Sequence, residues 1–177
     1  MTIPFRFEPS ESAAFAALLQ GGGRLLGLDP GTKTIGLSIC DDGWSVASPV
    51  GTVTRTTFTK DVEGLLAYTA REGVAGLVLG LPLNMDDSEG PRAQSSRAFA
   101  RNLARHSVLP VLFWDERLSS EAAYEAVREG KRQKRKTGAV DAIAATIILR
   151  SCLDVLRPDA RTSRHRASEG LPDGETP

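Results

Sequence analysis

Apolar and polar positions change their period several times along the chain, and each change predicts a different element. Three short apolar runs, RLLGLD, TIGLSIC and WSVASPVGTV, are separated by Asp-Pro-Gly and Asp-Asp-Gly, which are typical of tight turns. Runs of this length with turns between them predict three antiparallel strands at 24–29, 34–40 and 44–53.

The chain then alternates between helical spacing and continuous apolar runs. Helices are predicted at 60–72, at 91–105, from Ser119 or Ser120 through Val127, and along the apolar stripe from Val140 to Val155. Buried strands are predicted at 74–80 and 110–115. Crossover helices make the later strands parallel to the first. This order of strands and helices predicts an α/β fold: a three-layer domain with a mixed five-stranded sheet and helices on both faces.

We expect one domain over residues 24–156. Residues 1–23 are expected to form an N-terminal extension with a short helix around Phe15, ending in the glycines at 21–23. Residues 157–177 are rich in Pro, Arg, Ser and Gly and predict a disordered tail.

Composition narrows the class of protein. The 177 residues fit a single domain, and 41% hydrophobic with 25% charged residues is typical of soluble globular proteins. Lys plus Arg and Asp plus Glu both number 22, so any attraction to a polyanion must come from a local basic patch. Cys40 and Cys152 lie in apolar stretches without metal-type spacing and predict core thiols in a reducing compartment. No run reaches membrane length and the start lacks a signal pattern, so we expect a cytoplasmic protein without a membrane segment.

Acidic residues follow the predicted strands at the edge where ligands bind in such sheets. Asp29 ends the first strand, Asp115 and Glu116 end the last, and Asp141 lies in the first turn of the last helix. Each also has a structural explanation, as a turn residue, a partner of Arg117 or a helix-dipole partner. Taken together, three carboxylate segments at one crevice favour Mg²⁺ or Mn²⁺. The two histidines form no cluster with cysteine, which leaves zinc hydrolysis and a Ser/His/Asp triad without their parts.

Four motifs, GLDPGTKTIGLSICDD, GLPLNMDDSEGP, FWDERLSS and VDAIAATIIL, resemble the YqgF, or RuvX, family of RNase H-like nucleases, relatives of the RuvC Holliday junction resolvases. They occur in the family's order over most of the chain. The resemblance implies an RNase H-like fold, a metal-binding acidic triad, maturation of the 5′ end of small-subunit ribosomal RNA and a junction-resolving activity.

On this resemblance the triad maps to Asp29, Glu116 and Asp141 as metal ligands and catalytic residues, with Asp115 supporting or substituting for Glu116. Successive strand residues face opposite ways, so both acids bind the metal directly only if the strand bends there. The sequence departs from the family at Thr34, where a basic residue is common, and at Asp86–Asp87, where Asp-Gly is common.

Several residues are candidates for nucleic-acid contacts. A basic run directly before the Asp141 helix supplies phosphate-binding charge, although such a run also forms ordinary solvated loops. Exposed residues beside the predicted crevice are further candidates, with solvation or helix capping as the alternative. The candidates are Lys33, Asn84, Arg92, Lys131, Arg132, Lys134, Arg135 and Lys136.

The sequence therefore favours a metal-dependent nuclease that hydrolyses phosphodiester bonds of structured RNA or branched DNA, by a two-metal-ion mechanism. On the resemblance, pre-16S ribosomal RNA processing in ribosome biogenesis ranks first. Holliday junction resolution, for which a homodimer would suit a two-fold substrate, ranks second. A catalytically weak RNA-binding assembly factor is a third reading. A phosphotransferase of the actin type would need two such domains, and the length argues against it.

Overall fold

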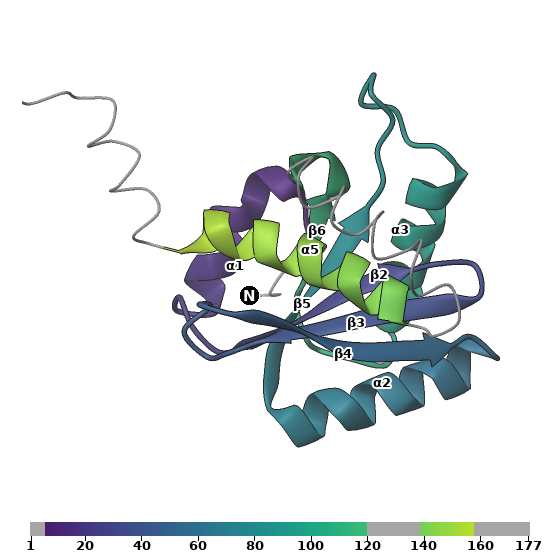
Figure 1. Ribbon diagram of the computed structural model, residues 1–177, viewed down its shortest axis with the longest axis horizontal. Coiled ribbons are helices and arrows are strands. Elements are labelled where there is room, and N and C mark those ends of the chain that lie inside the picture. The colour runs from purple at the N-terminus through teal and green to yellow at the C-terminus, as the bar shows by residue number, and fades with distance from the viewer. Residues whose placement is uncertain (1–5, 120–138, 158–177) are drawn as a thin grey trace, which may run out of the picture.

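The computed structural model describes residues 6–119 and 139–157, which form a sheet covered by helices (Figure 1). The strands are β1 (Arg6–Phe7), β2 (Arg24–Pro30), β3 (Thr34–Cys40), β4 (Ala47–Thr54), β5 (Val74–Leu81) and β6 (Val111–Asp115). The helices are α1 (Ser12–Leu18), α2 (Phe58–Glu72), α3 (Pro91–Leu103) and α5 (Ala139–Leu156), with short 3-10 turns η1 (Pro9–Glu11) and η2 (Glu116–Leu118).

The strands form one mixed sheet in the order β1-β6-β5-β2-β3-β4. The β2–β3 and β3–β4 pairs are antiparallel, while β5 is parallel to both β2 and β6. This arrangement confirms the RNase H-like α/β class that the sequence predicts. The strand count differs, because the sheet has six strands rather than five. The added strand β1 pairs in parallel with β6 through Arg6↔Val111 and Phe7↔Leu112, and two residues are too short to show a strand period.

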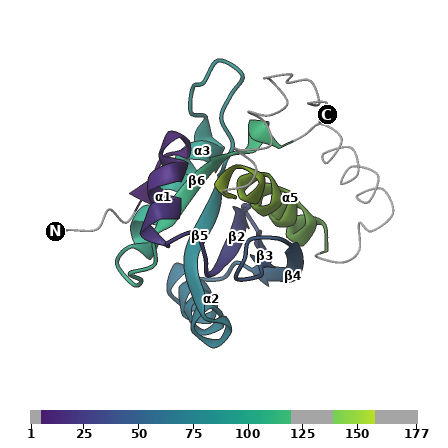
Figure 2. The same ribbon diagram turned by 90° about the vertical axis from the view of Figure 1, so that its left-hand side faces the viewer.

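The two faces of the sheet carry separate apolar cores, because side chains alternate along each strand. Leu26 and Leu28 of β2 pack on one face with residues of α2 and α3. Leu25 packs on the opposite face, among residues of α1 and α5. Figure 1 shows α5 and α2 on opposite sides of the sheet, and the view in Figure 2 agrees. The expected three layers with helices on both faces are therefore present.

Small residues bring α5 close to the sheet. A Cβ at Gly27 would lie 2.9 Å from the Cβ of Leu149 and 3.1 Å from the main-chain oxygen of Ala145. The Ser38 hydroxyl donates a hydrogen bond of 2.9 Å to that same Ala145 oxygen. Because helix and strands approach this closely, the middle of α5 has a fixed position over β2 and β3.

The segment before β2 packs against the sheet. Phe15 of α1 is fully buried and meets Phe7 edge to face at 5.5 Å. Arg97 of α3 forms a bidentate pair with Glu8 and lies over the Phe113 ring at 4.8 Å from its centroid. The predicted domain boundary at residue 23 stays a prediction, as does the tail from residue 157.

The helix predicted through Val127 lies outside the described residues. Among the helices that are described, none combines the length and apolar character needed to cross a membrane.

Candidate active site

Asp29 lies near the carboxyl end of β2, half-buried, directly opposite Gly36 of β3. Alternation places its side chain on the α5 face, with Leu25 and Gly27. The turn that follows is tightly held, because the Gly31 amide donates to the Thr34 carbonyl at 2.8 Å and the Arg55 guanidinium donates to the Gly31 carbonyl at 2.7 Å. Asp29 therefore stands on a rigid strand end.

Asp141 lies over the same face of the sheet, on the helix side. An ideal Cβ at Gly36 would lie only 2.0 Å from the main-chain oxygen of Asp141, so the first turn of α5 sits directly on that glycine. The Thr34 hydroxyl donates a hydrogen bond of 2.6 Å to Oδ2 of Asp141. Because Gly36 is the cross-strand neighbour of Asp29, the two aspartates belong to adjacent positions on one face.

Glu116 reaches the same face from the end of β6. Its Oε1 lies 2.7 Å from the position that a Cβ of Gly80 would take, and Ile148 Cδ1 of α5 lies 2.8 Å from the same point. The β2–β5 pairing runs as far as Leu28↔Leu79, which brings Gly80 beside Asp29. Glu116 is buried, with 9% of its surface exposed. The carboxyl group thus occupies space that any larger residue at position 80 would take.

Asp115 points away from this group. Its strand neighbour Phe113 belongs to the core under α2 and α3, and Asp115 itself accepts hydrogen bonds from Arg117 Nη2 at 2.7 Å and Nε at 3.0 Å. Arg117 also donates to the Asn84 carbonyl at 2.8 Å and to Asp87 Oδ1 at 2.7 Å. The hydrogen bonds that Arg117 donates to Asp115 first, and to Asp87, hold the pKa of Arg117 above its usual value.

The described nucleic-acid candidates lie at or near this edge. Lys33 is exposed in the turn after Asp29, and Asn84 is exposed in the loop between β5 and α3. Arg92 is exposed in the first turn of α3. The basic run Lys131, Arg132, Lys134, Arg135 and Lys136 lies outside the described residues.

The sequence matches a known protein family. Residues 23–155 match the RuvX family, described as Holliday junction resolvase. The chain belongs to the RuvX family. A relative from Sphingopyxis alaskensis, named as a candidate pre-16S rRNA nuclease, is 52% identical over 147 residues, which cover 80% of this chain and 93% of the relative. A protein of the same name from Paracoccus denitrificans is 52% identical over 149 residues, covering 84% and 94%.

The solved structures that match are less similar to this chain than these relatives are. Thermus thermophilus RuvC in complex with a Holliday junction substrate has a TM-score of 0.49 and 15% identity, over 75% of this chain and 94% of that one. The fowlpox virus Holliday junction resolvase has a TM-score of 0.47 and 14% identity, over 75% and 99%.

The donor set of this RuvX chain fits a hard divalent cation. Three carboxylates from β2, η2 and α5 share one face, and oxygen donors are those that Mg²⁺ and Mn²⁺ prefer. The glycine at position 80 leaves the room that Glu116 Oε1 occupies. Within 6–119 and 139–157, no three His, Cys, Asp or Glu side chains are already arranged as a metal cluster. One oxygen of Asp141 is engaged by Thr34.

Sequence reasoning left the supporting residues of this RuvX site unassigned. Gly36 and Gly80 lie inside strands, where glycine is a signal of close backbone or side-chain approach. The sequence presents Arg117 only as a partner of the neighbouring acid, and Thr34 only as a departure from the family pattern. No local signal identifies the Thr34 contact, because Asp141 lies 107 residues away.

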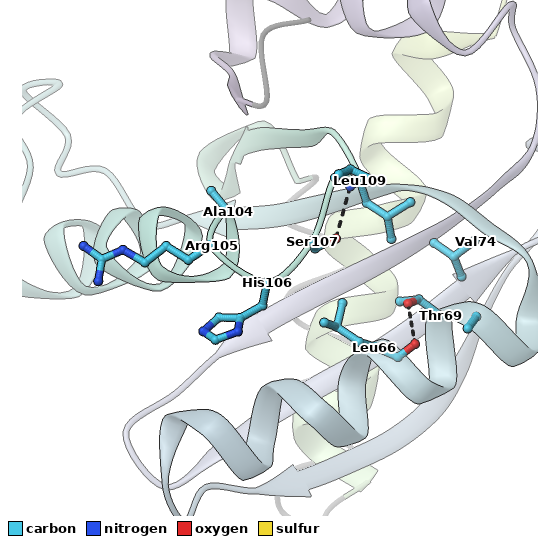
Figure 3. A pocket seen from close by; sticks show the side chains of 10 residues that line it. Leu66, Thr69, Val74, Ala104, Arg105, His106, Ser107 and Leu109 are labelled. Carbon is cyan, nitrogen blue, oxygen red and sulfur yellow. Dashed lines mark hydrogen bonds between the residues drawn. The ribbon is translucent and has the colours of Figure 1, made fainter.

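A separate hollow of about 580 Å³ opens at the opposite edge of the sheet (Figure 3). Leu66 and Thr69 of α2 line one side, and the loop through His106 and Leu109 lines the other. Val74 begins β5 here, so this hollow lies at the amino ends of the parallel strands. It is remote from the acidic residues, which lie at the carboxyl ends.

Proposed function

We propose that this RuvX chain is a divalent-metal-dependent nuclease that processes the 5′ end of pre-16S ribosomal RNA. The observation that carries the proposal is the common face of Asp29, Glu116 and Asp141 at the carboxyl edge of the sheet. Membership of the RuvX family and relatives of about 50% identity named for pre-16S rRNA cleavage support it.

In this proposal Asp29, Glu116 and Asp141 hold Mg²⁺ or Mn²⁺. When bound, a pair of such ions activates water and stabilises the charge that develops on the phosphoryl group and the leaving oxygen. Asp29 is the central ligand because its strand is rigid and lies between the other two acids. Asp115 accepts hydrogen bonds from Arg117. Arg117 in turn holds the loop between β5 and α3 near the end of β6. Lys33, exposed beside Asp29, offers a phosphate contact, as do Asn84 and Arg92.

The family description favours a second candidate function, which is cleavage of Holliday junctions. A junction has two-fold symmetry, so symmetric cleavage would suit a homodimer, whose mass light scattering can measure. A catalytically weak RNA-binding role in ribosome assembly is the third possibility, and it predicts binding without turnover.

The test is cleavage of a labelled panel containing a pre-16S rRNA fragment, single-stranded RNA, single-stranded DNA and a four-way DNA junction. Each substrate is incubated with Mg²⁺ or Mn²⁺ and wild-type protein, Asp29→Asn, or the control Asp42→Asn. Asp42 is an exposed acid in the β3–β4 turn, 77% exposed and remote from the site.

We expect metal-dependent cleavage of the pre-16S fragment by wild type and Asp42→Asn, and its loss in Asp29→Asn. Full cleavage by Asp29→Asn would disprove the site assignment. Preference for the four-way junction would favour resolution, and binding without cleavage by any protein would favour the assembly role.

A further inference from the structure

The hydroxyl of Thr34 makes a short contact with one acid of the site. It donates a hydrogen bond of 2.6 Å to Oδ2 of Asp141, in a partly buried position. The bond joins the first residue of β3 to the first turn of α5. It therefore links the strand side of the site directly to its helix side.

The backbone around Thr34 is held on both sides. Its carbonyl accepts the Gly31 amide at 2.8 Å, which closes the turn after Asp29. Thr34 also pairs with Thr54 of β4, and the Arg55 amide donates to the Lys33 carbonyl at 2.8 Å. On a fixed backbone, the few χ1 rotamers of a β-branched residue restrict the hydroxyl to a small set of positions from which it can hold the carboxylate.

This fixed donor matters because a carboxylate has two oxygens. A hydrogen bond to Oδ2 sets the rotation of the Asp141 side chain, and the carboxylate retains further lone pairs for a cation. Outer hydrogen bonds of this kind orient metal-binding carboxylates, and their removal typically costs 10–100-fold in metal affinity or activity. Thr34 brings no positive charge, so it orients the acid without competing electrostatically with a cation.

We infer that Thr34 is a positioning residue that orients the Asp141 carboxylate for a divalent cation. The inference rests on the proposed function, since it assigns a role at the same metal site. Thr34 itself need not touch the cation or the nucleic acid.

Mn²⁺ binding in the absence of nucleic acid tests this role, by calorimetry on the full chain. Thr34→Val removes the hydroxyl and keeps the branched shape, while Thr34→Ser restores a hydroxyl. Thr54→Val is the matched control, because Thr54 is the exposed cross-strand neighbour of Thr34. We expect about tenfold weaker Mn²⁺ binding in Thr34→Val. Thr34→Ser and Thr54→Val should stay within about twofold of wild type, with metal-free Tm values close together.

A double-mutant cycle separates orientation from general damage. In an Asp141→Asn background, Thr34→Val should cause little further loss of Mn²⁺ affinity, because the oriented carboxylate is already absent. Mn²⁺ binding by Thr34→Val that equals or exceeds wild type would overturn the inference. A tenfold loss that persists in the Asp141→Asn background would also overturn it.

Wild-type protein and Asp29→Asn, measured in the same experiment, test the proposed function itself. Wild-type protein that binds no Mn²⁺, or equal binding by wild type and Asp29→Asn, would overturn both the metal site and the role of Thr34. Wild-type binding that is lost in Asp29→Asn but unchanged in Thr34→Val would overturn only the role of Thr34.

Discussion

The main-chain carbonyl oxygen of Asp141 occupies the space that a side chain at Gly36 would need, 2.0 Å from the ideal Cβ position. The obstructing atom is backbone, which cannot rotate away as a side-chain end can. A glycine in β3 is therefore what allows the first turn of α5 to rest on the sheet beside Asp29. The two acids are close because β3 carries no side chain between them.

Gly36→Ala should destabilise the fold and displace the start of α5. Forcing a methyl group into a packed contact costs about 1–3 kcal/mol, and a backbone obstruction belongs at the upper end. Urea denaturation should give a lower free energy of unfolding than wild type. Gly64→Ala is the control, because a Cβ at this exposed α2 position meets nothing within 4 Å. It should add up to about 1 kcal/mol through helix propensity. Equal stability of Gly36→Ala and wild type would contradict the packing described above.

Asp115→Asn and Glu116→Gln should affect different properties, although the two residues are adjacent: the first should lower stability and the second should weaken Mn²⁺ binding. Asp115→Asn removes the charge that Arg117 binds, so Tm should fall while Mn²⁺ affinity stays within about twofold of wild type. Glu116→Gln removes a proposed metal ligand, so Mn²⁺ affinity should fall at least about tenfold. Its metal-free Tm should hold or rise, because repulsion among the grouped carboxylates decreases. Equal loss of Mn²⁺ binding in both variants would argue against the division of roles.

Arg117→Lys should loosen the loop between β5 and α3. The guanidinium contacts Asp115, the Asn84 carbonyl and Asp87 at once, and a lysine ammonium lacks the planar geometry to reach all three. Hydrogen exchange over residues 82–90 should become several-fold faster than in wild type. Arg101→Lys, an exposed change in α3, serves as the control and should leave that exchange unchanged. Wild-type exchange in Arg117→Lys would show that other contacts hold the loop.

Much of this architecture is predictable from local pattern. The helical spacing around Val62 and Leu65, and the continuous apolar runs of β5 and β6, identify elements because burial on one or both faces leaves a periodic trace in the sequence. The edge at which Asp29 and Glu116 lie also follows, because parallel strands share a carboxyl end. β1 is missed because its two residues gain their strand character from pairing with β6.

The internal geometry of the site is not predictable in the same way. The sequence leaves Asp115 and Glu116 as alternatives, since their order says only that they face opposite sides. The choice depends on where Arg117 binds, and its partners at 84 and 87 lie about thirty residues away. The contact between Thr34 and Asp141 likewise exists only once α5 has packed on β3. Such contacts between distant segments leave no periodic signal.

The two cysteines should be unreactive in the folded protein. Burial raises the pKa of Cys40 to about 11 and that of Cys152 well above its usual value. At pH 8 a thiol-specific disulfide reagent should label neither residue, and both should react after denaturation. Because the folded pKa of Cys40 exceeds the ordinary thiol pKa of 9.0, its stabilising contribution is complete below pH 9 and is lost as pH rises through about 11. Rapid labelling of native protein at pH 8 would contradict this burial.

Neutralising the basic run before α5 should weaken nucleic-acid binding and reduce its dependence on salt. The run contains Lys131, Arg132, Lys134, Arg135 and Lys136. Each phosphate contact releases counterions, so five contacts to a single strand contribute up to about 3.5 to the slope of log affinity against log salt. Changing all five to glutamine should lower the measured slope by as much as this, with affinity falling most at low salt.

The control for the basic run is glutamine at Arg71, Arg101 and Arg105, exposed residues near the carboxyl ends of α2 and α3. These lie at the sheet edge opposite the acids, so the change in slope per removed charge should be much smaller than for the basic run. Fluorescence anisotropy at several salt concentrations measures both slopes. Equal changes per charge would mean that binding follows the overall charge of the molecule, and the basic run would then have no special relation to the acidic site.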